Sequence, residues 1–447
     1  MQQLHLDTSI STLGQAKIPS PLSYCRPAPE DGYPLFIDGD CATGFDAELG
    51  TGKIVHFEAA GPRHSMYFDP SKSKCAIVTC GGLCPGINDV IRSIVLEAHH
   101  SYAIPSIIGI RYGLQGFIPK YKHPVMDLTP DAVTSIHQFG GTILGSSRGP
   151  QPPEDIVDAL ERMNINCVFM IGGDGTLRAA KAIYTCVQNR GLKIAIIGIP
   201  KTIDNDINFI SQSFGFETAV DKATEAIQCA HTEAIGAPNG IGLVKLMGRE
   251  SGFIAVQATL SLKEVNFLLV PEAPFSLEGE GGFLPVLAQR LKHRGHAVIV
   301  VAEGAGQHLL HAKKMANVTP ITEATDASGN SILGDIASLL REEICRYLKE
   351  LGMDHNIKFI DPSYSIRSIP ATANDRVYCG FLGQHAVHAA MAGRTGMVVA
   401  RLMDRYVHLP LDLVTSHRRV LNTCSEHWRS VAALTLGASQ KQSPIPK

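Results

Sequence analysis

The feature that most constrains the fold of this chain is an alternation of short apolar runs with helix-length amphipathic segments, which begins near Lys74. The runs are rich in Ile, Val, Leu and Ala, and they end in glycine or polar turns. Continuous apolar strands that alternate with helices are typical of parallel sheets covered by helices on both faces. The alternation therefore predicts an α/β fold.

Nine strands are predicted from these runs, which is more than a typical single sheet contains. They cover residues 76–80, 106–110, 168–172, 193–199, 241–246, 267–270, 297–302, 358–361 and 397–400. Helices are predicted at 88–99, 177–189, 217–230, 282–293, 334–351 and 375–392. We therefore expect two doubly wound, Rossmann-like parallel-sheet domains, with a ligand cleft between them beyond the carboxyl ends of the strands. Residues 1–72 have no sustained periodicity and are expected to form an N-terminal extension.

Composition excludes several classes of protein. The 447 residues carry a net charge of −2, from 40 Lys and Arg against 42 Asp and Glu, so no overall basic surface for nucleic acid or anionic membranes is expected. No apolar run approaches the roughly 20 residues of a membrane helix, and the sequence shows no signal peptide and no C-terminal Ser-Lys-Leu signal. The 11 cysteines lack paired spacings, which favours reduced thiols and a cytoplasmic location.

Two glycine turns that follow predicted strands are suited to binding phosphate. The turn at 81–86 would let backbone N–H groups approach an anion at a helix N-terminus, although many such turns only pack a strand against a helix. The turn at 172–176 places Asp174 among glycines, where a carboxylate would repel a bare phosphate unless a divalent cation bridged the two. Magnesium binds through one or two carboxylates plus phosphate oxygens, which explains the combination, and an Asp that only caps the helix is the alternative.

A third turn, at 200–206, holds two carboxylates two residues apart together with Lys201 and Thr202. One of Asp204 and Asp206 can accept a proton from a hydroxyl nucleophile while the other orients it, as phosphoryl transfer to a hydroxyl requires. An acidic turn without function is the alternative, but three such turns at strand ends would face the same cleft. Arginines at 249 and 367 are suited to bidentate contact with phosphate.

In this order the motifs resemble those of the 6-phosphofructokinase family. The resemblance rests on residues 81–86, 172–176, 200–206, 247–249 and 364–367, and it extends from about residue 57 to about residue 401. The segments at 57–63 and 78–86 are most similar to the ATP-dependent branch of plants and trypanosomatids.

The resemblance implies transfer of the γ-phosphoryl group of ATP to the 1-hydroxyl of fructose 6-phosphate, with Mg²⁺ as cofactor. ATP would be held by Gly82, Tyr112, Arg148, Gly149, Gly173, Asp174, Gly175 and Thr176, with Asp174 as the metal ligand. The sugar phosphate would be bound by Thr202, Ile203, Asp204, Met247, Gly248, Arg249, Glu303, Lys358, Tyr364, Ser365, Ile366 and Arg367. The catalytic residues would be the general base Asp204 with Thr202 and Asp206 beside it, Arg148 on the transferring group, and Lys201.

The resemblance also implies an ATP-binding domain at 73–209 and 371–425, and a sugar-phosphate domain at 210–370 and 426–447. A homotetramer is implied too, and Lys358 falls where the family has an arginine that reaches across a subunit interface. Allosteric control is common in the family. Leu96 replaces one of two effector-site arginines, which puts control by the bacterial ligands in doubt.

Residues 175 and 201 point to different phosphoryl donors. Gly175 is typical of ATP users, whereas Lys201 is typical of pyrophosphate users, and the plant and trypanosomatid ATP enzymes share this mixed pair. A pyrophosphate-dependent 6-phosphofructokinase is therefore the nearest alternative. A kinase for NAD or lipids with the same Gly-Gly-Asp-Gly turn, and an inactive regulatory or binding subunit on the same fold, are the others.

Overall fold

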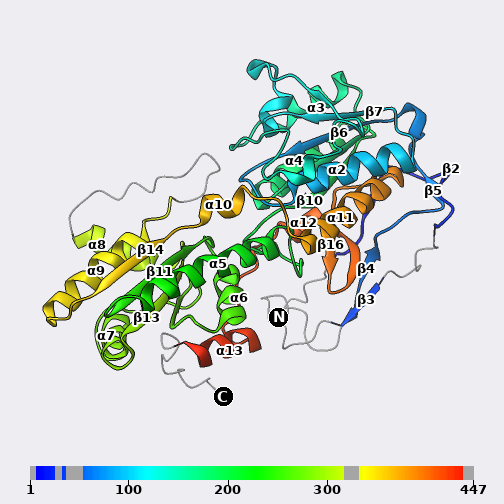
Figure 1. Cartoon of the computed structure of the whole chain (residues 1–447). Helices are drawn as coiled ribbons and strands as arrows, with labels where there is room; N and C mark the ends of the chain where they lie inside the picture. The colour runs from blue at the N-terminus through cyan, green and yellow to red at the C-terminus, as the bar shows by residue number, and fades with distance from the viewer. Residues whose placement is uncertain (1–6, 26–32, 37–53, 317–331, 436–447) are drawn as a thin grey trace.

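The structure is a computed structural model that describes residues 7–25, 33–36, 54–316 and 332–435. The remainder of the predicted N-terminal extension and residues 436–447 of the predicted tail lie outside the described residues. Figure 1 shows two α/β parts side by side, each built around its own sheet. The two sheets confirm the predicted fold class of two Rossmann-like parts.

The larger sheet contains nine strands within the described residues, in the order β3-β4-β17-β16-β10-β9-β6-β7-β8. Their bounds in chain order are β3 Tyr33–Phe36, β4 Ile54–Ala59, β6 Lys74–Thr79, β7 Ser106–Ile110, β8 Met126–Asp127, β9 Cys167–Gly172, β10 Ala195–Pro200, β16 Met397–Leu402 and β17 Arg405–Pro410. The central five, β16, β10, β9, β6 and β7, are mutually parallel.

The expectation of purely parallel sheets is wrong for the edges of this larger sheet. Strands β17, β4 and β3 at one edge, and β8 at the other, run antiparallel to their neighbours. Only two residues, Met403 and Asp404, connect β16 to β17, and such a hairpin can join only antiparallel strands. Strand β4 belongs to the predicted extension, so this extension adds strands to the sheet.

The smaller sheet is parallel throughout, in the order β12-β13-β11-β14. Its strands are β11 Gly240–Leu246, β12 Phe267–Leu269, β13 His296–Ala302 and β14 Asn356–Ile360. Two two-stranded sheets complete the strands of the described residues: β1 Ser11–Thr12 with β15 Arg394–Thr395, and β2 Ile18–Pro19 with β5 Ser65–Met66. The N-terminal residues that are described are thus tied to the body of the protein.

Helices cover the sheets, and the longer ones pack in pairs. Their bounds are α2 Ile87–Leu96, α3 Pro153–Arg162, α4 Asp174–Asn189, α5 Phe216–Ile235, α6 Phe253–Leu262, α7 Phe283–Arg294, α8 Gln307–Ala316, α9 Ile336–Glu350, α10 Ser363–Arg367, α11 Ala373–Met391, α12 Leu411–Val414 and α13 Glu426–Leu434. Helix α11 packs against α2, α3 packs against α4, and α5 packs against α6 and β11. Figure 1 shows α11, from late in the chain, lying beside α2 from its beginning.

The core of the larger sheet follows the two-residue period of its strands. In β6, Cys75 and Ile77 join the hydrophobic cluster that includes α2 and α11, whereas Ala76 and Val78 join the cluster beneath α3 and α4. All four side chains are almost completely buried. Burial on both faces explains why these strands are apolar without alternation, and each such Ile or Val contributes about 1.5–3 kcal/mol of transfer free energy.

The nine predicted strands and six predicted helices are all present, with ends that differ by a few residues. The predicted helix at 88–99 is α2 followed by a π-helical turn at Glu97–Ser101. The strands that were not predicted are β1 to β5, β8, β15 and β17, and the helices that were not predicted are α3, α6, α8, α10, α12 and α13. No helix within the described ranges is long and apolar enough to cross a membrane.

The chain crosses between the two parts several times. Helix α11 returns to the larger sheet, where it packs against β10, and α13 goes back to the smaller part, where it packs on α6. These contacts support the proposed domain limits, which remain a prediction.

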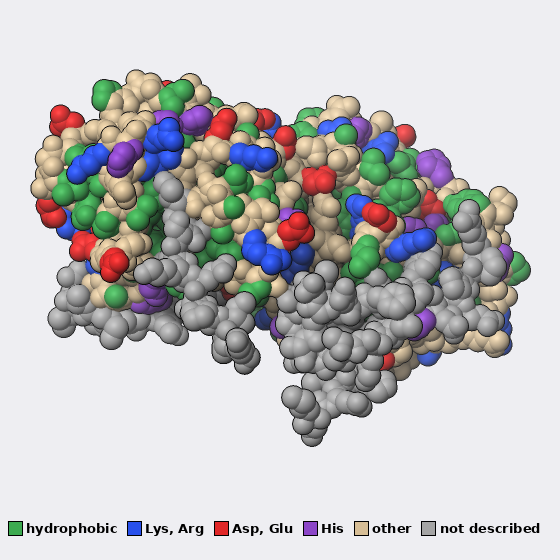
Figure 2. All heavy atoms as spheres, turned by 90° about the horizontal axis from the view of Figure 1, so that it is seen from below, with side chains coloured by type: hydrophobic (Ala, Val, Ile, Leu, Met, Phe, Trp, Pro, Cys, Tyr) green, Lys and Arg blue, Asp and Glu red, His purple; other side chains and the backbone are tan. Residues whose placement is uncertain are grey.

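Figure 2 shows Lys and Arg interspersed with Asp and Glu on the face seen from below.

Candidate active site

The three predicted phosphate turns lie at one edge of the larger sheet. Strands β10, β9 and β6 are parallel neighbours, so their carboxyl ends meet at the same edge. The turns that follow them contain Gly81 and Gly82, residues 173–176, and residues 201–206. Lys201 N–H donates to Gly172 O at 3.0 Å, and Cys80 N–H donates to Ile171 O at 2.9 Å, which holds the turns in register.

The smaller sheet contributes the opposite side of the site from the carboxyl ends of its own strands. Strand β11 is followed by Met247, Gly248 and Arg249, and its neighbour β13 is followed by Glu303. Gly304 N–H donates to Gly248 O at 3.0 Å, and a Cβ at Gly304 would lie 1.8 Å from Arg249 O. Only glycine at 304 allows the two loops to approach this closely.

The two groups of turns face a single cavity of about 820 Å³. The predicted site residues that line it are Gly82, Arg148, Gly149, Gly173, Asp174, Gly175, Thr176, Lys201, Thr202, Ile203, Asp204, Asp206, Arg249, Glu303, Tyr364 and Arg367. Ser147 of the loop before Arg148 accepts a hydrogen bond from Gly81 N–H at 3.3 Å, and Ser146 Oγ donates to Gly81 O at 2.6 Å. These bonds fix the loop that carries Arg148 against the first glycine turn.

Six predicted site residues do not line this cavity: Tyr112, Met247, Gly248, Lys358, Ser365 and Ile366. Met247 lies behind the site, since its Sδ accepts a hydrogen bond from Arg367 Nε at 3.1 Å, and Ile366 is fully buried in the core. Tyr112 packs its ring against His123, and Lys358 Nζ lies 3.8 Å from a Glu233 carboxylate oxygen on α5. Within this chain Tyr112 and Lys358 therefore face other neighbours than the cavity.

The turn after β10 is a compact hydrogen-bonded unit. Thr202 Oγ1 donates to Asp206 Oδ1 at 2.9 Å and accepts the backbone N–H of Asp204 at 3.1 Å. Asn205 adopts a left-handed conformation with φ of 56°, and its Oδ1 accepts the backbone N–H of Ser213 at 2.9 Å. The left-handed residue between Asp204 and Asp206 reverses the chain, so both carboxyl groups line the cavity while Asn205 itself is buried.

Asp204 has the electrostatic character of a general base. Burial, together with the nearby charges of Asp206 and Glu303, raises its pKa to about 7, against the opposing effect of Arg367 and Lys201. Its buried Oδ1 has no hydrogen-bond partner among the described residues. A carboxylate with a pKa near neutrality in the lining of a cavity can accept a proton from a bound hydroxyl group.

Lys201 is the buried cation of the site, with only 6% of its surface exposed. Its Nζ donates to Gly82 O at 2.6 Å. Burial lowers its pKa, and the negative charge of Asp204 acts in the opposite direction. The ammonium group is therefore bonded to the first glycine turn and feels the charge of Asp204.

The turn after β9 leads directly into α4, whose first residue is Asp174. The N-terminus of a helix favours anions, because its first N–H groups have no partner within the helix. A Cβ placed on Gly175 or on Gly82 would meet no atom within 4 Å, so both glycines border open space. The glycine turns thus leave room for a phosphate chain above the helix.

Asp174 is the residue best placed to hold a divalent cation. Its Oδ2 contacts two guanidinium groups, Arg178 at 2.8 Å and Arg418 at 3.3 Å, so the carboxylate already attracts positive charge. No cluster of three or more His, Cys, Asp or Glu side chains within the described residues is arranged to hold a metal ion. A single carboxylate at the start of α4 fits the way Mg²⁺ binds through one or two carboxylates plus substrate phosphates.

Several residues of the cavity were missed by the sequence analysis. Arg178 lies one helical turn after Asp174, and this four-residue spacing could have revealed the pair. Arg418 lies 244 residues from Asp174, in a segment with no recognisable motif, so no sequence signal pointed to it. Glu250, which does not line the cavity, directly follows the 247–249 motif, but nothing in the sequence marked it as the partner of Arg418.

Comparison with known proteins confirms the resemblance stated above. Residues 74–390 match the sequence model of the family described as Phosphofructokinase. The chain is 45% identical over 443 residues to the ATP-dependent 6-phosphofructokinase of Borreliella burgdorferi, covering 96% of this chain and 97% of that protein. It is 47% identical over 381 residues to the ATP-dependent 6-phosphofructokinase 7 of Arabidopsis thaliana, covering 85% of this chain and 77% of that one.

Among solved structures, the fold is similar to that of a pyrophosphate-dependent phosphofructokinase from Marinobacter aquaeolei. The TM-score is 0.64 at 21% sequence identity, and the match covers 84% of this chain and 94% of the other. At this identity the likeness extends to the fold alone.

Proposed function

This chain belongs to the phosphofructokinase family, and from that premise we propose that it transfers the γ-phosphoryl group of ATP to the 1-hydroxyl of fructose 6-phosphate. The products are ADP and fructose 1,6-bisphosphate. The observation that carries the proposal is the position of Asp204, a carboxylate with a raised pKa that lines one cavity with the Asp174 turn and with Arg249 and Arg367.

The residues on the donor side would bind the phosphates of ATP and orient them. The N–H groups at the start of α4 and of the glycine turn at Gly82 would donate hydrogen bonds to the phosphate oxygens, and Arg148 and Lys201 would offset the charge on the transferring group. Asp174 would hold Mg²⁺, which when bound neutralises charge on the phosphate oxygens.

The residues on the acceptor side would fix the sugar and activate its hydroxyl group. Arg249 and Arg367 are suited to the 6-phosphate, because a guanidinium binds phosphate through two parallel hydrogen bonds. Asp204 would accept the proton of the 1-hydroxyl as its oxygen bonds to the γ-phosphorus and the bond from that phosphorus to the bridging oxygen breaks, so that ADP leaves. Thr202 orients Asp206 beside it through the 2.9 Å hydrogen bond.

ATP is the favoured donor because Gly175 leaves the space above α4 open. Pyrophosphate is the second candidate, and the observation that favours it is Lys201, which places a buried cation at the donor end of the cavity. The curated relatives named above are both ATP-dependent. Their identity of 45% or more supports ATP over pyrophosphate.

A coupled assay that detects fructose 1,6-bisphosphate tests the proposal with each donor in the presence of Mg²⁺. We expect turnover with ATP and little or none with pyrophosphate. Turnover with pyrophosphate alone would assign the alternative donor. Tight binding of fructose 6-phosphate without turnover from either donor would instead indicate an inactive binding subunit.

A homotetramer is also proposed, on the family resemblance. Light scattering during size-exclusion chromatography measures the mass directly, and four times the 48.1 kDa of one chain is expected. A mass equal to one chain would refute it.

A further inference from the structure

We propose that Arg418 is a positioning residue that couples the two substrate sites, because one guanidinium group holds a carboxylate on each side of the cavity. Arg418 belongs to the segment 415–425, which connects α12 beside the larger sheet to α13 on the smaller part and is called the crossing segment below. The inference rests on the proposed function, since it assigns Asp174 to the donor site and Arg249 to the acceptor site.

The two contacts of Arg418 use different nitrogen atoms of its guanidinium group. Its Nε lies 3.3 Å from Asp174 Oδ2, and one terminal nitrogen lies 2.6 Å from Glu250 Oε1. Glu250 directly follows Arg249 in the sugar-phosphate loop. Only 21% of the Arg418 side chain and 14% of the Asp174 side chain are exposed, so solvent screens this pair little.

The backbone of the crossing segment is anchored to both sides. Arg418 forms an isolated antiparallel bridge with Ile207, and Arg419 N–H donates to Asp206 O at 2.9 Å. Leu421 N–H donates to Glu272 Oε1 at 2.9 Å, and the same oxygen accepts Gly252 N–H at 3.0 Å. The segment therefore joins the catalytic turn, through the Glu272 carboxylate, to the loop that carries Arg249.

The charge of Arg418 also offsets a cluster of like charges. Burial raises the pKa of Asp206, Asp174 raises it further, and Arg418 acts in the opposite direction. Without a cation between them, Asp174 and Asp206 would repel each other across the cavity. Arg418 thus helps to hold both carboxylates in place for their proposed roles.

Arg178 provides a natural comparison, because it contacts the same oxygen of Asp174 at 2.8 Å. It lies one turn along α4, its side chain is 58% exposed, and both partners belong to the same helix. Arg178 can stabilise the charge of Asp174, but among the described residues it has no hydrogen bond or ion pair with the smaller part. Variants of the two arginines can therefore be compared. Loss of Arg178 tests a local effect on Asp174, whereas loss of Arg418 tests the link between the two substrate sites.

Coupling follows from this double attachment. A ligand that changes the charge at Asp174 changes the force on Arg418, and hence on Glu250 and the adjacent Arg249. Two sites that share one cation influence each other's affinity by the same factor in both directions. Such coupling would favour the complex in which both the phosphoryl donor and the sugar phosphate are bound before transfer.

The experiment measures the dissociation constant of fructose 6-phosphate by titration calorimetry, with and without saturating ADP and Mg²⁺, so that no transfer occurs. The ratio of the two constants is the coupling factor, expected to be at least about fivefold in the wild type. Repeating the titrations with ADP and a chelator separates the nucleotide from the metal. These readouts do not depend on turnover.

The variants Arg418→Ala and Glu250→Ala should each bring the coupling factor close to one, and the double variant should lose no more than either alone. Arg418→Lys should lose most of the coupling as well, because one ammonium cannot reach both carboxylates as a guanidinium does. If Arg418→Ala does not fold, Arg418→Lys and Glu250→Ala still decide the question. Retained coupling in these variants would overturn the inference.

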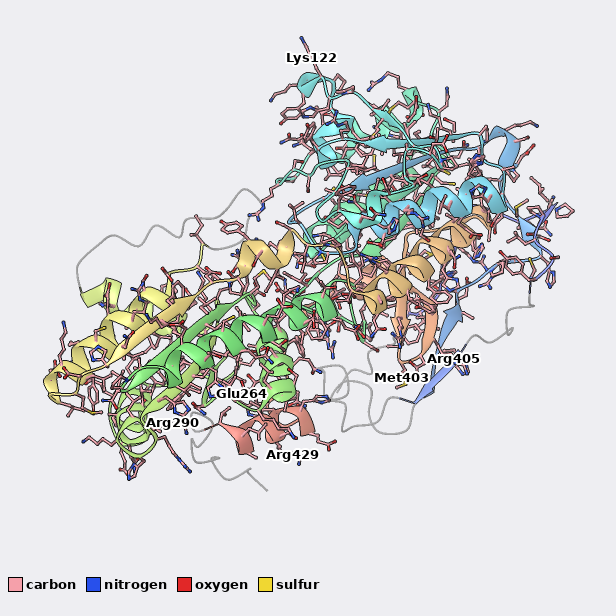
Figure 3. All side chains as sticks on the ribbon, viewed as in Figure 1. Lys122, Glu264, Arg290, Met403, Arg405 and Arg429 are labelled. Carbon is pink, nitrogen blue, oxygen red and sulfur yellow. The ribbon has the colours of Figure 1, made fainter. Side chains whose placement is uncertain are left out.

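Two control variants sharpen the result. Arg178→Ala should weaken ADP binding but keep the coupling factor, and equal loss of coupling in Arg178→Ala would overturn the specific role of Arg418. Arg429, labelled in Figure 3 on α13, is an exposed arginine on the helix that follows the crossing segment. Arg429→Ala should therefore keep the wild-type coupling factor.

The proposed function and this inference fail in different ways. A wild-type protein that turns over fructose 6-phosphate with neither donor refutes the function. A wild-type protein that is active but shows a coupling factor of one, or an Arg418→Ala variant that keeps the wild-type factor, refutes only the inference.

Discussion

Lys201 donates a hydrogen bond from Nζ to the carbonyl oxygen of Gly82 at 2.6 Å, across 119 residues of sequence. The bond joins the turn after β10 to the turn after β6, on either side of β9. A buried cation is thereby fixed at the donor end of the cavity. Because its position is set by the protein and not by the ligand, its charge is preorganised for the transition state.

Replacing Lys201 by Met, which keeps an unbranched side chain but removes the charge, should lower kcat by about 10²-fold or more. The KM for fructose 6-phosphate should change much less, because Arg249 and Arg367 are proposed to bind the sugar phosphate. Steady-state kinetics with each substrate varied check the prediction. An unchanged kcat would remove Lys201 from the catalytic residues.

Replacing Gly175 by Asp should raise the KM for ATP by about tenfold or more. No atom lies within 4 Å of a Cβ at this position, so the fold should tolerate the side chain. The added carboxylate next to Asp174 would repel the phosphates, and a repulsion of about 1.4 kcal/mol corresponds to tenfold. Gly175→Asn, of nearly equal size but neutral, separates charge from bulk, and equal kinetics for the two variants would contradict the charge argument.

Replacing Asp204 by Asn should lower kcat by about 10²–10⁴-fold, the usual contribution of a general base. Wild-type turnover should rise with pH and level off above about pH 7, because burial raises the pKa of Asp204 to about 7 and only the ionised form accepts a proton. A pH–rate profile of kcat/KM measures this. A profile that is flat between pH 6 and 8 would argue against Asp204 as the base.

The same substitution should stabilise the protein at alkaline pH. A carboxyl group whose pKa is higher in the folded state contributes stability at low pH, and this stability is lost as pH rises through about 7. Asn cannot ionise, so the variant should melt at a higher temperature than the wild type at pH 8. Thermal melts at pH 5 and pH 8 compare the two, and an equal difference at both values would refute the prediction.

Replacing Glu58 by Gln should destabilise the fold at neutral pH. Burial alone would raise the pKa of Glu58, but the hydrogen bond with His408 and the charges of Arg394 and Arg63 lower it to about 2, from 4.5. This shift corresponds to about 3 kcal/mol of stability above pH 5, lost as pH falls from about 4.5 toward 2. Urea unfolding of both proteins between pH 7 and pH 3 measures the difference, which should shrink as the pH is lowered.

The positions of the central strands were largely predictable, because a strand that is buried on both faces is a continuous run of apolar residues. Strand β7 is predicted at its observed bounds, and β9 begins one residue earlier than expected. Strand β17 was missed because the hairpin at Met403 and Asp404 contains no glycine, although Met403 adopts a left-handed φ of 52°. Strand β4 was missed because the sequence on either side of it does not alternate apolar runs with amphipathic helical segments.

The candidate site was predictable where its chemistry is concentrated in turns after strands. Asp174, Asp204 and Arg249 lie in such turns, and parallel strands bring their ends together. Arg418 could not be found in this way, since its place in the cavity depends on the path of a loop between α12 and α13. Pairing with Glu250 requires knowledge of how the two sheets are arranged.

The crossing segment has a consequence for how the enzyme is made. Arg418 follows Asp174 by 244 residues and is the last of the cavity-lining residues to be synthesised. Until then, the acidic groups of the cavity lack a counter-ion that the finished protein supplies. The lining of the cavity is therefore complete only once residue 418 has been added, and cleavage within residues 415–425 is expected to weaken the link between the two sides of the cavity.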